Sequence, residues 1–365
     1  MITVSISFII SSFIVIMLLL IFTIKKVVPL SPFLYSNARI QARTKFLISN
    51  TKFIELAECN SLRELANSLR ETEYAEELDK VDINNLKQFQ LALEKSFVAS
   101  LIDLRDLSPN KLKDVFNAYL MFLEAKILKT IYRAVSSNSK LDKMLVFPVG
   151  NITSELLRHL LEAKTIADLR VVLEATPYKS VFSKDYSSLE EFEVALEEFI
   201  FNNFVKTIQK TKIYEGKYII EILNTKIDIL NLLALIKFRI RGIEKEKQHK
   251  LLIYNKTKLC ERFEDLINSK DFYSFVDVCK ELPYYEALVK ALEKYKKDSS
   301  LLHFEHELYS YYKRFVIDAE LYHTLGPYPL FSYLTKKEIE LRNLFIISKG
   351  IELKFTAEKI KELII

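Results

Sequence analysis

Three segments that each end in tyrosine decide the fold of this chain: SLRELANSLRETEY at residues 61–74, TIADLRVVLEATPY at 165–178 and DFYSFVDVCKELPY at 271–284. Their closing tyrosines are 104 and 106 residues apart. The segments open on Ser61, Thr165 and Asp271, whose side-chain oxygens suit a helix N-cap, and apolar residues follow at helical spacing. The sequence therefore predicts one helical unit repeated three times.

The composition predicts an all-α fold. The 365 residues include only 5 glycines and 8 prolines, most of them where a helix would have to stop, and runs typical of strands are nearly absent. Half of the chain is hydrophobic, which is enough to bury real cores. We expect long helices joined by few turns.

A second pattern pairs an asparagine with a basic residue six positions later inside a helical stretch. The pairs are Asn37 with Arg43, Asn231 with Lys237, and Asn343 with Lys349. The pattern supports the repeat, although three unrelated basic helices would produce it too, and the second unit lacks it.

The N-terminal segment is predicted to be a transmembrane helix. No charged residue occurs from Met1 to Ile24, and Lys25 and Lys26 follow directly. A helix of that length covers the ~30 Å hydrocarbon layer, and the lysines favour a cytoplasmic body. This places the chain at the cell membrane, with the body on its cytoplasmic face. The alternative is a signal peptide, which would need basic residues before the apolar run.

No residue pattern argues for catalysis. Neither GxxxxGK[ST] nor GxGxxG occurs, so direct nucleotide binding has no support, and no serine or cysteine lies in a nucleophile elbow. HFEHE at 303–307 could offer two histidines to a metal, but a solvated polar turn is the preferred interpretation. We expect no catalytic, cofactor-binding or metal site.

Charge and cysteine content bear on nucleic-acid binding and on the compartment of the protein. The net charge is +5, but acidic and basic residues are interleaved, which gives little support to nucleic-acid binding. Three scattered cysteines suit a reducing compartment.

Near the C-terminus, Thr335 and Glu338 are expected to form a capping box, Gly350 a left-handed C-cap, and Thr356 the N-cap of a last helix.

Several motifs resemble a known family. They are YSNARI at 35–40, the ETEY and ATPY ends of the first two units, DILNLLALIKFRIRG at 228–242 and LGPYPLFSYLTKKEIELRNLFIISKG at 325–350. In order and spacing they are similar to the C subunits of archaeal A-type ATP synthases and the d subunits of V-type ATPases. The resemblance covers nearly the whole chain.

The resemblance implies a funnel of three helical units around a pseudo-threefold axis. It implies a non-catalytic central-stalk component that couples a proteolipid ring, driven by protons or sodium ions, to the central shaft. The implied partners are the proteolipid subunits, shaft subunits of the D and F types, and membrane lipid. Candidate interface residues are Tyr35, Arg39, Arg43, Lys237, Arg239 and Arg342, because tyrosine and arginine are favoured at interfaces.

We divide the chain into an anchor, a linker and three units, at residues 1–26, 27–34, 35–120, 121–227 and 228–365. A membrane-anchored helical scaffold for other protein partners is the main alternative function. A repeat near 105 residues is longer than the ~20–50 residues of ordinary solenoids, which argues against it. An enzyme in a helical fold is the third possibility.

Overall fold

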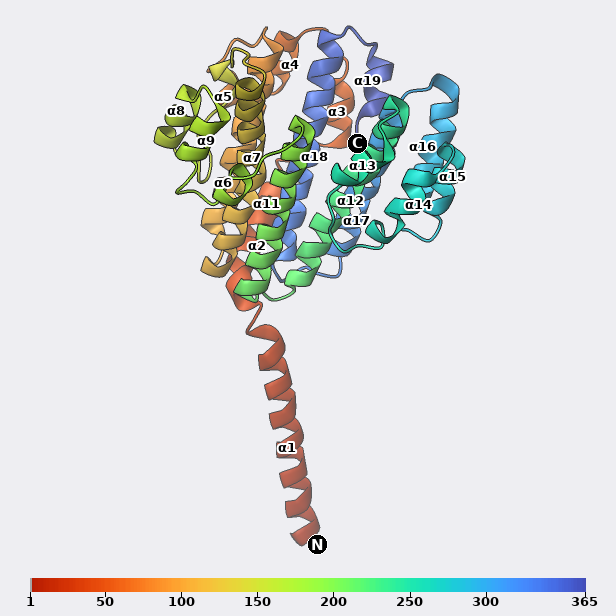
Figure 1. Cartoon of the computed structure of the whole chain (residues 1–365). Helices are drawn as coiled ribbons and strands as arrows, with labels where there is room; N and C mark the ends of the chain where they lie inside the picture. The colour runs from red at the N-terminus through yellow and green to blue at the C-terminus, as the bar shows by residue number, and fades with distance from the viewer. Residues whose placement is uncertain (1) are drawn as a thin grey trace.

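The computed structural model describes the backbone of residues 2–365 and the side chains of 11–25 and 27–365. Within that range it contains helices and no strand, which confirms the all-α prediction (Figure 1). Six long helices form its frame: α6 (Leu86–Leu107), α7 (Asn110–Ser136), α11 (Leu189–Thr211), α12 (Gly216–Arg241), α17 (Leu302–Glu320) and α18 (Tyr328–Glu352).

These six helices close into what we call the inner ring. Each packs on the next in the order α6, α7, α11, α12, α17 and α18, and α18 returns to α6. Short turns join α6 to α7, α11 to α12 and α17 to α18 at the narrow end of the body (Figure 1). The helices α2 (Leu34–Thr44) and α19 (Ala357–Leu363) both pack against α18.

Three outer clusters of short helices follow one another at the wide end. Cluster 1 holds α3 (Asn50–Leu56), α4 (Leu62–Ser68) and α5 (Ala75–Leu78). Cluster 2 holds α8 (Ser154–Glu162), α9 (Ile166–Val172) and α10 (Lys179–Phe182). Cluster 3 holds α13 (Lys245–Lys250), α14 (Phe263–Asn268), α15 (Phe272–Val278) and α16 (Tyr285–Asp298).

The helix starts predicted at the repeated segments are confirmed. Ser61, Thr165 and Asp271 are the N-caps of α4, α9 and α15, and each side chain accepts a hydrogen bond from the third backbone N–H of its helix. Thr356 likewise caps α19. The caps succeed as predictions because they depend only on residues within one turn.

Each closing tyrosine fastens its cluster to the inner ring. The Tyr178 hydroxyl donates to Glu124 on α7 at 2.5 Å, and Tyr284 donates to Asp228 on α12 at 2.9 Å. Tyr74 donates to Glu340 on α18 at 2.7 Å. All six side chains are buried. The three carboxylates therefore mark equivalent positions on α7, α12 and α18, the helices that repeat around the ring.

The last of these contacts joins the two ends of the chain. Cluster 1 lies near the N-terminus, whereas Glu340 belongs to the C-terminal hairpin. Glu340 also accepts from the backbone of Ile48 at 2.7 Å, and Lys313 bridges the carbonyl of Ile365 at 2.9 Å and Asn50 at 3.2 Å. We call this junction the seam, because no backbone crosses it.

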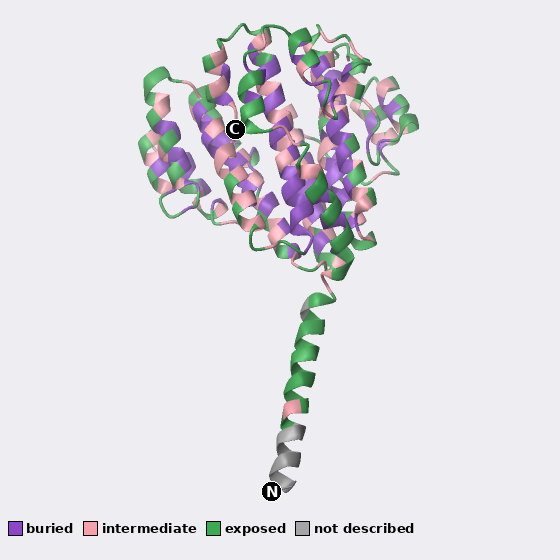
Figure 2. Ribbon diagram, turned by 180° about the vertical axis from the view of Figure 1, so that it is seen from behind, coloured by how far each residue is buried: buried purple, intermediate pink, exposed green. Residues whose placement is uncertain are grey.

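The predicted transmembrane helix is wrong, and so is the membrane localisation that rested on it. The helix α1 (Ile2–Val27) projects from the narrow end, and its described side chains are largely exposed (Figure 2). Over the part of the chain that the structure describes, no helix is long and apolar enough to span a bilayer. The predicted run begins at residue 1, where side chains lie outside the described part.

Two predictions about the C-terminal hairpin are also wrong. Thr335 and Glu338 form no capping box, because α18 begins a full two turns earlier at Tyr328 and Thr335 is buried inside it. Gly350 does not end the helix; α18 continues to Glu352. Gly350 instead allows a close approach, since an added Cβ would lie 2.6 Å from Ile360. The boundaries predicted at 120/121 and 227/228 fall within α7 and α12 and stay a prediction.

Candidate interaction surfaces: the hollow and the tip

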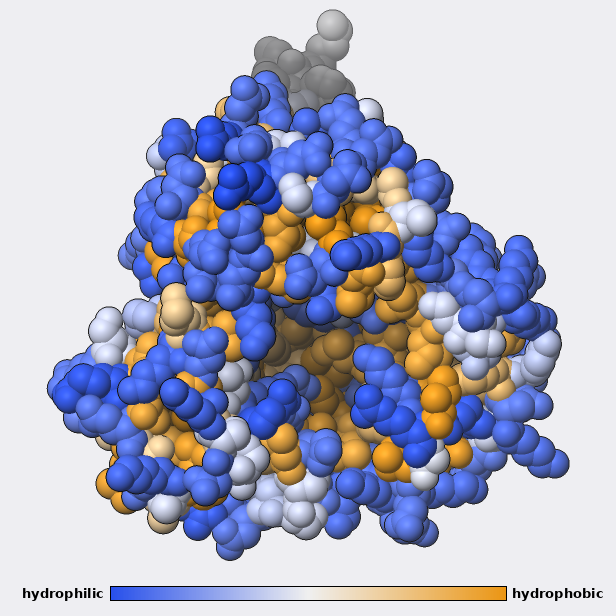
Figure 3. Space-filling view, turned by 90° about the horizontal axis from the view of Figure 1, so that it is seen from above, coloured by the Kyte–Doolittle hydropathy of each residue, from blue (hydrophilic) through white to orange (hydrophobic). Residues whose placement is uncertain are grey.

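The inner ring encloses a hollow that opens at the wide end. Viewed from above, hydrophobic surface lies at its centre and hydrophilic side chains surround it (Figure 3). Part of it is a cavity of about 410 Å³ between α7, α11 and α12. Its apolar lining comes from Phe122, Ala125, Leu223, Ile227 and Leu230.

A polar cluster closes the floor of the hollow, where the three equivalent helices meet. Lys226 of α12 lies 2.6 Å from Glu338 of α18, and Tyr119 of α7 donates a short hydrogen bond to the same carboxylate. Burial raises the pKa of Tyr119 well above its usual value, and the Glu338 charge adds to this. Tyr119 therefore stays a neutral donor, and the floor has no unpaired charge among these groups.

Ion pairs between neighbouring helices line the wall. Lys126 of α7 pairs with Glu94 of α6, and Arg133 of α7 pairs with Glu193 of α11 at 2.6 Å. Two further pairs are Lys129 with Glu197, and Arg342 with Glu305. The Arg342 guanidinium lies 3.8 Å from the centre of the Tyr309 ring, and burial lowers its pKa to about 10. These pairs fix adjacent helices to each other without filling the space between them.

The narrow end, which we call the tip, exposes apolar side chains. They come from the turns that join α11 to α12 and α17 to α18 and from the start of α2: Tyr214, Leu321, Tyr322, Leu325, Leu34 and Tyr35. The strongest exposure is 84% at Tyr322 and 74% at Leu321. Exposed apolar side chains gathered at one end of a molecule are typical of interaction sites. Asn37 donates to the carbonyl of Gly326 at 3.0 Å and so holds α2 against this turn.

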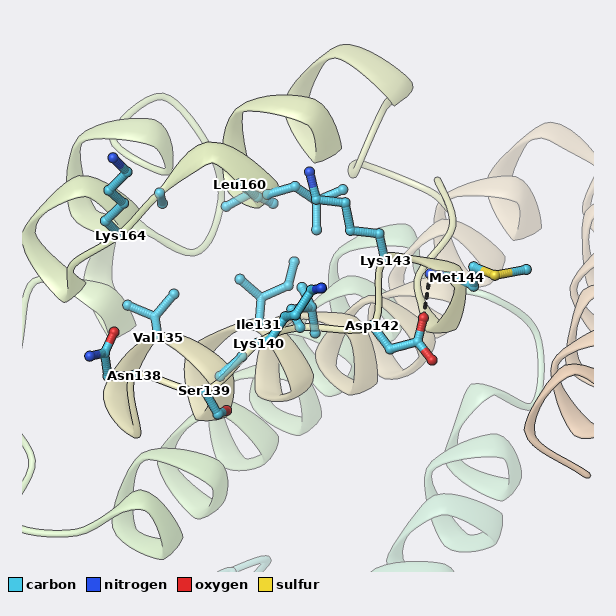
Figure 4. Close-up of a pocket in the computed structure, with 14 residues that line it drawn as sticks. Ile131, Val135, Asn138, Ser139, Lys140, Asp142, Lys143, Met144, Leu160 and Lys164 are labelled. Carbon is cyan, nitrogen blue, oxygen red and sulfur yellow. Dashed lines mark hydrogen bonds between the residues drawn. The ribbon is translucent and has the colours of Figure 1, made fainter.

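A separate cleft lies outside the hollow, and its lining offers no set of reactive side chains. It has a volume of about 760 Å³ between the end of α7, the following loop and α8 (Figure 4). Apolar side chains line it together with lysines, and its one carboxylate, Asp142, accepts from the backbone of Met144 at 3.1 Å. Among the described side chains, no group of three His, Cys, Asp or Glu could hold a metal ion.

The six interface residues predicted from the sequence do not lie together. Tyr35 and Arg39 are exposed on α2 beside the tip, and Arg43 pairs with Asp103 at 3.1 Å. Lys237 is exposed near the wide end of α12, and Arg342 lies in the wall of the hollow. Their role at an interface stays a prediction.

Arg239, another predicted interface residue, makes its contacts within this chain. It donates to the carbonyls of Leu266 at 3.3 Å and Ser269 at 2.7 Å, at the end of α14. Its guanidinium also lies over the Phe272 and Phe275 rings, 6.0 and 5.8 Å from their centres. Arg239 thus stabilises cluster 3 from within the chain.

Sequence reasoning missed the floor of the hollow. Lys226 and Glu338 are 112 residues apart, and nothing in either local pattern indicates that they meet. One signal is present in the sequence: Glu124, Asp228 and Glu340 recur at nearly the spacing of the tyrosines, so residues two positions before each carboxylate are equivalent as well. Those positions hold Phe122, Lys226 and Glu338.

A closed ring of repeated helices, with a hollow at one end and exposed apolar side chains at the other, defines a class of all-α structural protein. The chain belongs to the family described as ATP synthase (C/AC39) subunit, whose profile matches residues 36–363. It is thus a non-catalytic subunit of a rotary ATPase, as the sequence predicted.

Relatives named as the C subunits of A-type ATP synthases match over most of their length. The protein from Methanocaldococcus jannaschii is 30% identical over 361 residues, which covers 93% of this chain and 88% of the relative. The one from Pyrococcus abyssi is 27% identical, with 92% and 90% covered. The one from Methanothermobacter thermautotrophicus is 26% identical, with 91% and 87% covered. The resemblance seen in the sequence is confirmed.

Proposed function

We propose that this chain is a rotor subunit of an A-type ATP synthase that couples the ion-driven proteolipid ring to the central shaft. The tip would bind the proteolipid subunits and the hollow would receive the shaft. Family membership supports the assembly to which the chain contributes. The observation that carries the rest is the presence of two distinct surfaces at opposite ends of one closed ring of helices.

The tip suits a partner that presents apolar surface. Burying a large apolar side chain removes it from water and contributes about 1.5–3 kcal/mol. Leu321 and Tyr322 each expose most of their surface. Burial of these two side chains against a partner would by itself stabilise an assembly substantially. The hollow suits a segment that enters along the axis, because its mouth is open while its floor is closed by Tyr119, Lys226 and Glu338.

Transmission of torque requires that the two ends turn together. The six ring helices run from one end to the other, and each is packed on both neighbours. A closed ring resists twisting because every helix is held by a neighbouring helix on each side. Ion pairs across the wall, such as Arg133 with Glu193, add links between adjacent helices.

The test is affinity purification of the tagged full chain from gently solubilised membranes, with mass spectrometry of the proteins recovered. We expect the native chain to recover both proteolipid and shaft subunits. The variant Leu321→Glu/Tyr322→Glu should lose the proteolipid and keep the shaft. The matched control is Val171→Glu/Phe46→Glu, at side chains that are 77% and 82% exposed outside the tip, and it should keep both.

Two results would overturn the proposal. One is a native chain that recovers neither partner, or only unrelated proteins, as expected of a generic helical scaffold. The other is equal recovery of proteolipid by the tip variant and the native chain. Circular dichroism of the purified variants establishes that any loss is not unfolding.

A further inference from the structure

Three basic residues occupy equivalent positions at the mouth of the hollow. Arg133, Lys237 and Lys349 each lie nine residues beyond the carboxylate that binds a closing tyrosine, on α7, α12 and α18 respectively. All three are exposed. We call them the collar.

Helix geometry directs the collar toward the axis. Nine residues turn an α-helix through about 180° from the starting side chain. The carboxylates point outward to the tyrosines of the outer clusters, so the collar points the opposite way, into the hollow. Contacts elsewhere agree with this orientation: Arg239, eleven residues beyond Asp228 and so about 20° from it, reaches cluster 3.

The collar carries positive charge that the floor lacks. Lys226 on the floor is paired with Glu338, and Arg133 in the collar with Glu193. Lys237 and Lys349, by contrast, form no ion pair with any residue from 11 to 365 whose side chain is described. The hollow therefore combines an apolar lining just above its polar floor, from Phe122, Ile227 and Leu230, with unneutralised lysines at its mouth.

From this arrangement, and resting on the proposed function, we infer that the shaft segment received by the hollow is a helical end with an apolar tip and carboxylates about three turns behind it. The spacing follows from the ring itself. The floor and the collar are eleven residues apart on each helix, which is about 16 Å of rise. An aspartate or glutamate at that height would lie at the level of Lys237 on α12 and Lys349 on α18.

The collar side chains can adjust to the segment that enters the hollow. Lysine side chains are long and flexible, and each can follow a carboxylate over several ångströms. Attraction to the mouth speeds encounter, while apolar contact at the base keeps the segment seated. We therefore expect the collar to act mainly on the rate of association and on its salt dependence.

The experiment uses the full chain and purified shaft subunits of the same complex as the probe. Lys237→Glu/Lys349→Glu reverses the two unpaired collar charges. The matched control is Lys270→Glu/Lys280→Glu, which reverses two exposed lysines of cluster 3 and changes the net charge equally. Stopped-flow association and equilibrium binding are measured at two salt concentrations.

We expect the collar variant to raise Kd about tenfold or more at low salt, mainly through slower association. The native chain should lose affinity between about 50 and 200 mM salt as screening grows, and the collar variant should not. The control should match the native chain. Equal effects of collar and control variants, or no effect of either, would overturn the inference alone. Failure of the native chain to bind the shaft subunits would overturn the proposed function as well.

Discussion

Two of the three tyrosine contacts lie within continuous chain, and the third lies across the seam. Glu124 and Tyr178 are 54 residues apart, and Asp228 and Tyr284 are 56 apart, so each pair belongs to one helix and the cluster that follows it. Glu340 and Tyr74 are 266 residues apart. Clusters 2 and 3 are each connected by the backbone to the ring helix that their tyrosine contacts. Cluster 1 is held to α18 by side chains alone, and additional contacts are found there.

The clearest difference is a buried lysine. Lys337 lies three residues before Glu340 and pairs with both Glu340 and Glu73, whereas the equivalent positions hold Met121 and Thr225. The apolar core follows the same division: cluster 1 packs with the top of α6, the end of α18 and α19 as a core of its own. We interpret the seam as the junction on which closure of the ring depends.

The largest effect is expected from Lys337→Met, which gives α18 the residue found at this position in α7. Glu340 would keep its hydrogen bonds from Tyr74 and Ile48 but lose its buried cation, and breaking a buried pair in this way costs about 3–5 kcal/mol. Urea unfolding checks the loss. Lys337→Met/Glu340→Gln should recover part of it, because no buried unpaired charge remains; Glu73, the other partner of Lys337, is partly exposed to water. A loss below about 1 kcal/mol for the single variant would mean that the seam does not depend on this ion pair.

A second comparison uses two asparagines that make the same contact. Asn231 accepts from the backbone N–H of Ile253 at 3.0 Å and donates to its carbonyl at 2.8 Å. Asn343 does the same to Ile365, at 2.9 and 3.0 Å. Asn231→Ala leaves two buried backbone groups unsatisfied, at about 1–3 kcal/mol each. Asn343→Ala should cost less than about 1 kcal/mol, because the short helix α19 and Ile365 beside it can open locally and expose both groups to water.

Hydrogen exchange separates the two asparagine variants. Asn343→Ala should speed exchange in α19 and around Ile48 while the rest of the ring stays protected. Asn231→Ala should lower the global free energy of unfolding without a local opening of this kind. If both variants destabilise the chain equally and globally, Ile365 is held as firmly as Ile253 and the distinction between seam and continuous units fails.

The residues that sequence reasoning predicts well act within one turn of helix. Ser61, Thr165 and Asp271 are caps whose chemistry needs only the next three residues. Thr335 with Glu338 matches the same pattern but lies inside α18, because the i, i+3 spacing suits a helix interior as well as a start. The pattern could not reveal that Glu338 meets Lys226 of another helix. Pairing between distant helices is decided by packing, and one sequence does not contain that information.

The same limit applies to larger features. The tyrosines are recognisable as repeat ends, but their buried carboxylate partners are marked only by a similar spacing, because a lone acidic residue on a helix usually faces solvent. The predicted transmembrane helix relies on counting uncharged residues and is wrong for the part of the chain that the structure describes. Repeats therefore reveal the number and order of units, while closure of the ring requires the structure.

A smaller effect is expected from removing single tyrosine hydroxyls. Tyr178→Phe leaves Glu124 with only its Asn151 partners, and a hydrogen bond to a charged group is worth about 1.5–3 kcal/mol. Tyr74→Phe should cost less, at about 1 kcal/mol, because Lys337 and the Ile48 N–H still satisfy Glu340. Urea unfolding of the two variants side by side tests this. The reverse order would show that the lysine does not support the seam.

The smallest expected effect is on the pH dependence of the free energy of unfolding. Its sign differs between the tyrosine contacts within continuous chain and the contact across the seam. Burial raises the pKa of Glu124 and of Asp228. The folded chain then holds protons that the unfolded chain has released, so stability falls as pH rises from about 4 through the raised pKa values. Glu124→Gln/Asp228→Asn should remove that fall, seen by urea unfolding at several pH values.

At the seam the titrating group is a base, and burial lowers the pKa of Lys337. The unfolded chain binds the extra proton there, so stability contributed by this group rises with pH between the lowered pKa and about 10.4. Lys337→Met/Glu340→Gln should flatten the alkaline part of the profile, because the double variant removes the base together with the buried carboxylate that it neutralises. Urea unfolding at several pH values measures this slope. A double variant that kept the native alkaline slope would mean that Lys337 is not the group that titrates at the seam.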